Sequence, residues 1–159
     1  MTQNRWPKLR CADNRDCPGI AELVFTVLRE YNLAPDPEST DADLKDIEES
    51  YLKRGGAFFV LEDRPGLIIG AYGLYRIDKA TCELRKMYLH RSFRGKGLGK
   101  SLLQDALEEA RQMGFKKVTL ETASVLTEAA NLYRSYGFVE YQPEHLSRRC
   151  DRALQLELK

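Results

Sequence analysis

A glycine-rich run with basic residues precedes an apolar helical pattern, and it reads Arg94-Gly95-Lys96-Gly97-Leu98-Gly99-Lys100-Ser101. Glycines let a backbone approach an anion without a Cβ in the way. A helix that begins within the run adds unpaired N–H donors and the positive end of its dipole. Because Arg94, Lys96 and Lys100 bring compensating charge, the run predicts a binding site for a phosphate group.

Two common phosphate motifs nearly fit this run, and each fails at one residue. The Walker A loop, G-x-x-x-x-G-K-[ST], would end on the required Gly-Lys-Ser but needs glycine where Arg94 stands. The dinucleotide fingerprint, G-x-G-x-x-G, matches Gly95 and Gly97 and then meets Lys100 instead of glycine. No magnesium-site pattern supports the first motif, so a nucleoside-triphosphate enzyme is disfavoured.

A third pattern, R-x-x-G-x-G, fits from Arg94 to Gly99 and resembles the acetyl-CoA pyrophosphate loop of the GCN5-related N-acetyltransferase (GNAT) superfamily. The flanks match as well. Upstream, Glu83–Leu89 looks like the family's preceding strand, and downstream Ala129–Phe138 looks like its A-x-x-L-Y-x-x-x-G-F segment. Three matches in the right order make the resemblance specific from Glu83 to Phe138, and the likeness is weaker toward both ends.

The resemblance implies acetyl-CoA as co-substrate and no metal. Its pyrophosphate would lie on the glycine run, with the residues Arg94, Gly95, Lys96, Gly97, Leu98, Gly99, Lys100 and Ser101 in contact and Arg94 as a bidentate clamp. The two amides of the pantetheine arm would pair with the strand edge Met87, Tyr88 and Leu89. A backbone N–H near Leu89 would polarise the thioester carbonyl.

The family likeness also implies two catalytic side chains. Glu83 is the candidate base that accepts a proton from the incoming amine, directly or through water. The alternative for Glu83 is a strand-edge carboxylate paired with Arg85 or Lys86. Tyr133, four residues before a glycine, is the candidate acid that protonates the departing thiolate. The alternative for Tyr133 is a packing residue on a helix face.

One position departs from the family pattern. Many relatives carry an asparagine seven residues before the tyrosine, where it contacts the cofactor, and this chain has Leu126. Thr122 and Ser124 are substitute candidates. Cys82 is the only cysteine near the expected chemistry, but no histidine flanks it to form a thiolate pair. The expected mechanism is therefore direct attack by the amine in a ternary complex.

The acceptor amine is not identified by any cluster in the sequence. The expected acceptor-side candidates are His90, His145, Tyr31, Asn32 and Tyr72. We expect a small metabolite, because short connections leave no extra element for docking a peptide. A protein or peptide N-acetyltransferase stays open, as does a CoA-binding regulatory or interaction module without catalysis, although Glu83 and Tyr133 argue against the module.

Chain length, net charge and composition limit the class of protein. The 159 residues suit a single domain, 1–159, with a formal net charge of +1, which does not suggest a nucleic-acid partner. Four widely spaced cysteines indicate reduced thiols in a cytoplasmic protein. Met1–Arg10 lacks an apolar signal core and no apolar run is long enough for a membrane span, so no membrane partner is expected. A homodimer stays open.

Hydrophobic periodicity predicts the elements that position these residues. The expected strands are Lys8–Ala12, Ala57–Glu62, Leu67–Arg76, Cys82–Leu89, Lys117–Glu121, Phe138–Tyr141 and Ala153–Leu158. The expected helices are Ile20–Tyr31 with Asp16 as cap, Asp41–Lys53, Leu98–Met113 and Thr127–Tyr136. This order, β-αα-βββ-α-β-α-ββ, matches the GNAT fold, an α/β (α+β) fold with a mixed, mostly antiparallel seven-stranded sheet and about four helices. The resemblance implies that its fourth and fifth strands splay to admit CoA.

Overall fold

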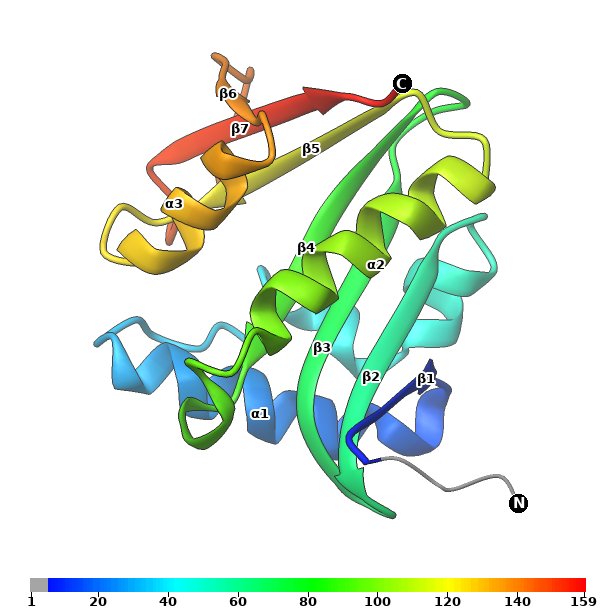
Figure 1. Cartoon of the computed structure of the whole chain (residues 1–159), viewed down its shortest axis with the longest axis vertical. Helices are drawn as coiled ribbons and strands as arrows, with labels where there is room; N and C mark the ends of the chain where they lie inside the picture. The colour runs from blue at the N-terminus through cyan, green and yellow to red at the C-terminus, as the bar shows by residue number, and fades with distance from the viewer. Residues whose placement is uncertain (1–5) are drawn as a thin grey trace.

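The computed structural model describes residues 6–159. The expectation that Met1–Arg10 contains no signal segment falls partly on residues 1–5, which lie outside the described residues. One seven-stranded sheet in the order β1-β2-β3-β4-β5-β7-β6 organises the chain (Figure 1). No helix within residues 6–159 is long and apolar enough to cross a membrane.

The elements follow the predicted order, with one exception among the helices. The strands are β1 Lys8–Cys11, β2 Ala57–Arg64, β3 Leu67–Arg76, β4 Thr81–Leu89, β5 Lys117–Thr122, β6 Val139–Glu140 and β7 Arg152–Glu157. The α-helices are α1 Cys17–Glu30, α2 Leu98–Gln112 and α3 Thr127–Ser135. Shorter helical turns are η1 Asn14–Asp16, η2 Ala42–Lys45, η3 Glu48–Leu52 and η4 Arg91–Phe93. Most predicted ends differ by one or two residues, as is usual where elements fray.

The first four strands pair antiparallel in chain order, and for β2, β3 and β4 this is the arrangement that their short connections predicted. In the hairpin between β2 and β3, Arg64 pairs with Leu67, so the turn consists of Pro65 and Gly66. Gly66 has a φ of 85°, which a residue with a Cβ adopts only at a cost. The hairpin therefore extends β2 two residues beyond the predicted end.

The sheet opens between β4 and β5. These strands are parallel, but they pair only where Thr81–Glu83 lies beside Lys117–Thr119. Beyond that point β5 continues with β7 as its antiparallel partner, and β4 and β5 diverge (Figure 1). The splay implied by the family resemblance is confirmed.

Helices cover both faces of the sheet. The residues of α1, η2 and η3 pack on one face in a core that includes Ile20, Val24, Val27, Leu28, Leu44 and Phe58. The other face carries α2 and α3 in a core that includes Leu74, Leu102, Leu103, Leu107, Leu120 and Tyr133 (Figure 1). The apolar stripes of α1 and α2, read from sequence at helical spacing, are the stripes that the structure buries.

The predicted helix Asp41–Lys53 is wrong as one element. It is broken into the 3₁₀ turn η2 and the π-helical turn η3 by Asp46, which has a φ of −154° and a ψ of 86°. The Asp46 carboxylate accepts hydrogen bonds from Asn14 Nδ2 at 2.9 Å and from the Glu49 N–H at 3.0 Å, so it begins a new turn. Leu52, expected on the apolar stripe, is 37% exposed.

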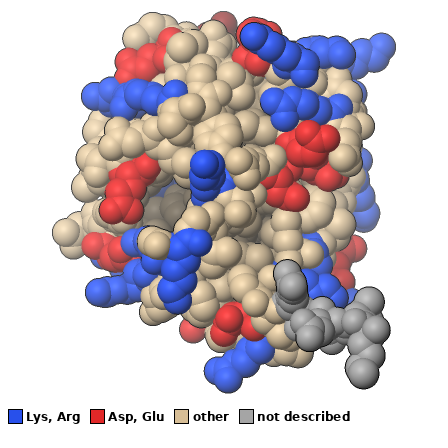
Figure 2. Space-filling view, in the orientation of Figure 1, with Lys and Arg blue, Asp and Glu red and all other residues tan. Residues whose placement is uncertain are grey.

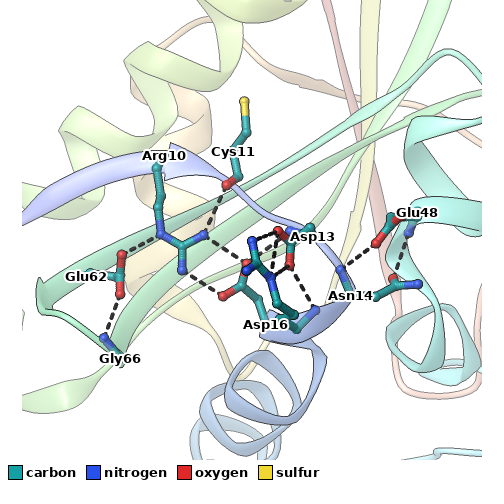
Figure 3. Close-up of polar contacts among 9 residues, drawn as sticks. Arg10, Cys11, Asp13, Asn14, Asp16, Glu48, Glu62 and Gly66 are labelled. Atoms are coloured by element: carbon teal, nitrogen blue, oxygen red, sulfur yellow. Dashed lines mark hydrogen bonds and ion pairs between the residues drawn. The ribbon is translucent and has the colours of Figure 1, made fainter.

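The expected cap of the first helix is also corrected. Asp16 directly precedes α1, but its side chain makes no capping hydrogen bond to that helix. Arg10 holds this carboxylate at 2.7 Å and also binds Glu62 on β2 (Figure 3). Asp13 instead caps η1 by accepting the Arg15 N–H at 2.9 Å. Arg10 thereby joins β1, β2 and the start of α1.

Candidate active site

A cleft of about 540 Å³ lies where β4 and β5 separate. Residues of α1, β4, the glycine-rich run, the end of β5, α3 and the 141–151 loop line it. Figure 2 shows the surface hollowed on this side of the molecule, with acidic and basic side chains beside the opening. The splay thus supplies a cavity of the size that small-molecule sites occupy.

The glycine-rich run turns sharply into α2. Gly95 and Gly97 have φ values of 79° and 81°, and a Cβ at either would meet nothing within 4 Å. Glycine is therefore needed here for its backbone conformation and not for space. The first hydrogen bond of α2 runs from Ser101 N–H to the Gly97 carbonyl at 3.1 Å, so the N–H groups before Ser101 can bind an anion.

The predicted cofactor residues divide into two sets. Those that line the cleft are Met87, Tyr88, Leu89, Arg94, Gly95, Gly97, Gly99 and Lys100. Lys96, Leu98 and Ser101 are outside its lining: Lys96 Nζ lies 5.6 Å from the centre of the Phe93 ring, Leu98 packs against the core, and Ser101 Oγ donates to the Gly97 carbonyl.

Arg94 is already engaged by the protein. Its Nε donates to the Leu89 carbonyl at 3.0 Å, Nη1 donates to Tyr31 Oη at 3.2 Å, and Nη2 donates to Glu30 at 3.1 Å. Arg94 therefore ties the glycine-rich run to β4 and α1, and its role as a bidentate clamp on a pyrophosphate stays a prediction.

The open edge of β4 carries an irregularity. Tyr88 pairs with Ala71 and Arg85 pairs with Gly73, so β4 has one more residue than β3 over this stretch. Lys86, in this bulge, has a φ of 55°, which is uncommon for a residue other than glycine. Because β4 pairs with β5 only as far as Glu83, the following edge faces the cleft without a strand on that side among residues 6–159.

Glu83 lies at the point where the strands part, and its side chain lines the cleft. Arg85 Nε donates to Glu83 Oε1, and the Arg85 guanidinium carbon lies 3.7 Å from the centre of the Tyr75 ring. The alternative considered from sequence, pairing with Arg85, is therefore present. This pairing holds the carboxylate at the start of the cleft.

Tyr133 is both a packing residue and a cleft residue. Its ring is 6% exposed, meets Phe138 edge to face at 5.7 Å, and lines the cleft. Burial raises the pKa of its phenol, with smaller contributions from nearby Tyr88 and Cys150, so the group keeps its proton at neutral pH. Tyr136, which directly follows α3, does not line the cleft.

Sequence reasoning missed a buried ionic group, which we call the Asp41 cluster: Asp41, Asp43, Lys86 and Arg149. Arg149 binds Asp41 with two hydrogen bonds of 2.8 and 2.9 Å. Lys86 Nζ lies 3.3 Å from Asp41 and 3.2 Å from Asp43. Burial alone would raise the pKa of Asp41, but the hydrogen bonds from Arg149 and from the Asp36 N–H, together with the charge of Lys86, more than offset it and hold that pKa low. The cluster joins the 141–151 loop to the segment before η3.

The cysteines are placed differently from the expectation. Cys82 is fully buried outside the cleft lining, and burial raises the pKa of its thiol to about 12. Cys150 lines the cleft instead, and burial raises its pKa as well. The expectation that Cys82 is the only cysteine near the chemistry is therefore wrong, and neither thiol is held as a reactive thiolate.

Of the acceptor-side candidates, Tyr31 lines the cleft. His90, His145, Asn32 and Tyr72 are not part of its lining: His90 caps η4 by accepting the Ser92 N–H at 3.1 Å, His145 is exposed, Asn32 follows α1, and Tyr72 donates to Asp105 at 2.5 Å. Leu126 and Thr122 line the cleft, whereas Ser124 donates to Asp151. Within residues 6–159, no group of three or more His, Cys, Asp or Glu is placed to hold a metal ion.

Known proteins match this chain over most of its length. The model of the acetyltransferase (GNAT) family matches residues 21–138. Uncharacterized N-acetyltransferase YjgM of Escherichia coli is 39% identical over 137 residues, which cover 83% of this chain and 81% of that protein.

Two solved structures have the same fold. An acetyltransferase of the GNAT family from Staphylococcus aureus superposes with a TM-score of 0.88 at 24% identity, over 96% of this chain and 99% of that one. A GNAT superfamily phosphinothricin acetyltransferase from Sinorhizobium meliloti, in complex with acetyl-CoA, superposes with a TM-score of 0.73 at 22% identity, over 97% of this chain and 89% of that one. The family model, the relative from E. coli and the splayed sheet agree that this chain belongs to the GNAT family of acetyltransferases.

Proposed function

We propose that the protein transfers an acetyl group from acetyl-CoA to a primary amine by direct attack in a ternary complex. The observation that carries the proposal is the single cleft at the splay, which brings together the glycine-rich run, the open edge of β4, Glu83 and Tyr133. The donor complex seen with the S. meliloti enzyme supports acetyl-CoA as the co-substrate here.

The donor half of the cleft matches the parts of CoA. The N–H groups at the start of α2 bind the pyrophosphate, and the helix dipole contributes about 0.3–1 kcal/mol in addition to their hydrogen bonds. Lys100 adds a positive charge at the same place. The pantetheine amides pair with the edge Met87–Leu89 as an added strand would, and a backbone N–H there polarises the thioester carbonyl.

The chemical step needs one proton acceptor and one proton donor. Glu83 takes a proton from the ammonium group, directly or through a water, and frees the nitrogen lone pair. The amine then attacks the thioester carbon, and the C–S bond of the tetrahedral intermediate breaks. Tyr133 donates its phenol proton to the departing sulfur, and its phenolate recovers a proton from the acylated nitrogen, directly or through water. The products are an acetamide and CoA with a free thiol, and the proton on Glu83 passes to solvent. The raised pKa of Tyr133 favours this protonated donor.

The acceptor that we propose is a small metabolite in the cytoplasm. The 141–151 loop is held close to the cleft by the Asp41 cluster and by the Ser147 N–H bond to Glu121, which leaves little room for a peptide chain. Two other functions make different predictions. A protein N-acetyltransferase would acetylate peptide termini faster than small amines, and a regulatory CoA-binding module would bind acetyl-CoA without turnover.

The experiment that tests the function is a free-thiol release assay with acetyl-CoA and pooled amines, with products identified by mass spectrometry. Amine-dependent thiol release together with a product 42 Da heavier than one pooled amine is expected, since acetylation replaces a hydrogen with an acetyl group. Calorimetric binding of acetyl-CoA without turnover on any amine would instead support the module. An acetylated cysteine trapped on the intact protein would overturn direct attack.

Gly97→Ala is expected to raise KM for acetyl-CoA several-fold. Alanine at a φ of 81° costs about 1–2 kcal/mol, so the backbone of the turn shifts to relieve the strain. Its N–H groups then no longer point at the pyrophosphate. Gly66→Ala is the matched control, because Gly66 has a φ of 85°, equally open surroundings and a position in the β2–β3 turn. Equal KM values for the two variants would contradict the role of the glycine-rich run.

A further inference from the structure

The basic side chains of the cleft are nearly all neutralised by the protein itself. Those that line it are Arg85, Lys86, Arg94, Lys100 and Arg149. Four of them form ion pairs, which are Arg85 with Glu83, Lys86 with Asp41 and Asp43, Arg94 with Glu30, and Arg149 with Asp41. Of these five, only Lys100 has no ion pair with the described part of the chain, and it lies in the first turn of α2, at the donor end.

The carboxylate of Glu121 has no ion-pair partner among the described residues. It lies near the end of β5 and lines the cleft. Its Oε1 accepts the Ser147 N–H at 2.7 Å, and no basic side chain of the described chain lies in ion-pair distance of it. The backbone hydrogen bond fixes the direction of the side chain and leaves its negative charge unpaired.

The register of the sheet places Glu121 beside the expected reaction centre. Glu83 pairs with Thr119, and Glu121 is two residues further along β5, so both glutamates point to the same face about 6.6 Å apart along the strand direction. Burial raises the pKa of Tyr141, and both carboxylates add to that rise. Glu83, Glu121 and Tyr133 all line the cleft.

Resting on the proposed function, we propose that Glu121 binds the ammonium group of the acceptor and that this acceptor is a cationic amine without a carboxylate on its amino-bearing carbon. A cation there meets an unpaired carboxylate, which makes a charge-assisted hydrogen bond. An α-amino acid would bring its own carboxylate next to Glu83 and Glu121. Because the nearby Arg85, Lys86 and Arg149 are already paired, that charge would be desolvated without a partner.

The first test takes the best acceptor from the pooled screen and compares it with its counterpart that differs only in the α-carboxylate. The pool includes the pairs tyramine and tyrosine, histamine and histidine, and ethanolamine and serine. The amine without the carboxylate is expected to have a kcat/KM at least about tenfold higher. A best acceptor that is an α-amino acid, or equal values within a pair, would overturn the inference and leave the proposed function intact. No thiol release with any amine would defeat the proposed function itself.

The second test is Glu121→Gln, which keeps a side-chain oxygen for the Ser147 N–H and removes the charge. We expect KM for the amine to rise about tenfold while KM for acetyl-CoA stays unchanged. Glu144→Gln removes an equal charge from an exposed position in the 141–151 loop, which also carries Ser147, and is the control. Thermal unfolding checks that both variants fold. A KM for the amine that is unchanged in Glu121→Gln, or that rises equally in Glu144→Gln, would contradict the role of Glu121.

Discussion

Replacing Tyr133 with phenylalanine is expected to lower kcat by about 10²–10⁴, the usual contribution of a positioned acid, while KM for acetyl-CoA stays unchanged. The variant keeps the ring that packs against Phe138 and removes only the hydroxyl that would protonate the departing sulfur. Because burial raises the pKa of this phenol, it stays protonated across the neutral range. The pH profile of kcat for the wild type should therefore show no change in the neutral range from ionisation of Tyr133.

Tyr136→Phe is the matched control for this measurement. Tyr136 lies next to α3, and its hydroxyl is buried without a hydrogen-bond partner among the described residues. Removing that hydroxyl should leave kcat unchanged. Steady-state thiol release with the best acceptor gives kcat and both KM values for the two variants. If Tyr133→Phe turned over at the wild-type rate, Tyr133 would be a packing residue and another group would protonate the thiolate.

Asp41→Asn is expected to lower the free energy of unfolding by about 3–5 kcal/mol at pH 7, as when one member of a buried ion pair is removed. The Asp41 side chain is fully buried, and it is the shared partner of Lys86 and Arg149. Asparagine has nearly the same size and can still accept the Asp36 N–H, but it removes the charge and places an NH2 donor where one oxygen accepted from Arg149. Urea unfolding followed by circular dichroism measures the difference.

The stability difference between wild type and Asp41→Asn should depend on pH. Burial raises the pKa of Asp41, but the Arg149 hydrogen bonds and Lys86 lower it further, so the native state holds this carboxyl deprotonated to a lower pH than the unfolded chain does. Its stabilisation is complete above the unfolded pKa of about 3.9 and is lost as pH falls toward the lower native value. The difference between wild type and Asp41→Asn should therefore shrink below about pH 4.

Glu144→Gln, at an exposed position in the loop that carries Arg149, should change stability by less than about 0.5 kcal/mol at either pH. A difference between wild type and Asp41→Asn that stayed constant from neutral to acid pH would mean that the charge of Asp41 does not stabilise the fold. Asp41→Asn should also lower activity, because Asp41 is a partner of Lys86 and Lys86 lies in the bulge of β4 that borders the cleft.

Local patterns predicted most of the elements because their causes are local. The stripe Leu102, Leu103, Ala106 and Leu107 marks α2, and the alternation Leu154, Leu156 marks β7, wherever the rest of the chain goes. The break at Asp46 was missed because its partner, Asn14, is 32 residues away. A hydrogen bond of that kind overrides helix propensity and leaves no periodic signal in the sequence.

The sequence by itself determined the family, and it predicted the phosphate-binding turn and the candidates Glu83 and Tyr133, because a glycine turn and short motifs carry their chemistry within a few residues. Only the tertiary structure decided which charges in the cleft are already paired. Arg149 meets Asp41 across 108 residues, and Arg94 meets Glu30 across 64. Whether a charge is left unpaired, as for Glu121, depends on which segments far away in the sequence lie beside it in the folded chain. The tertiary structure therefore decides which charges are free where the acceptor is proposed to bind. The residues proposed to bind acetyl-CoA can instead be predicted from consecutive positions in the sequence.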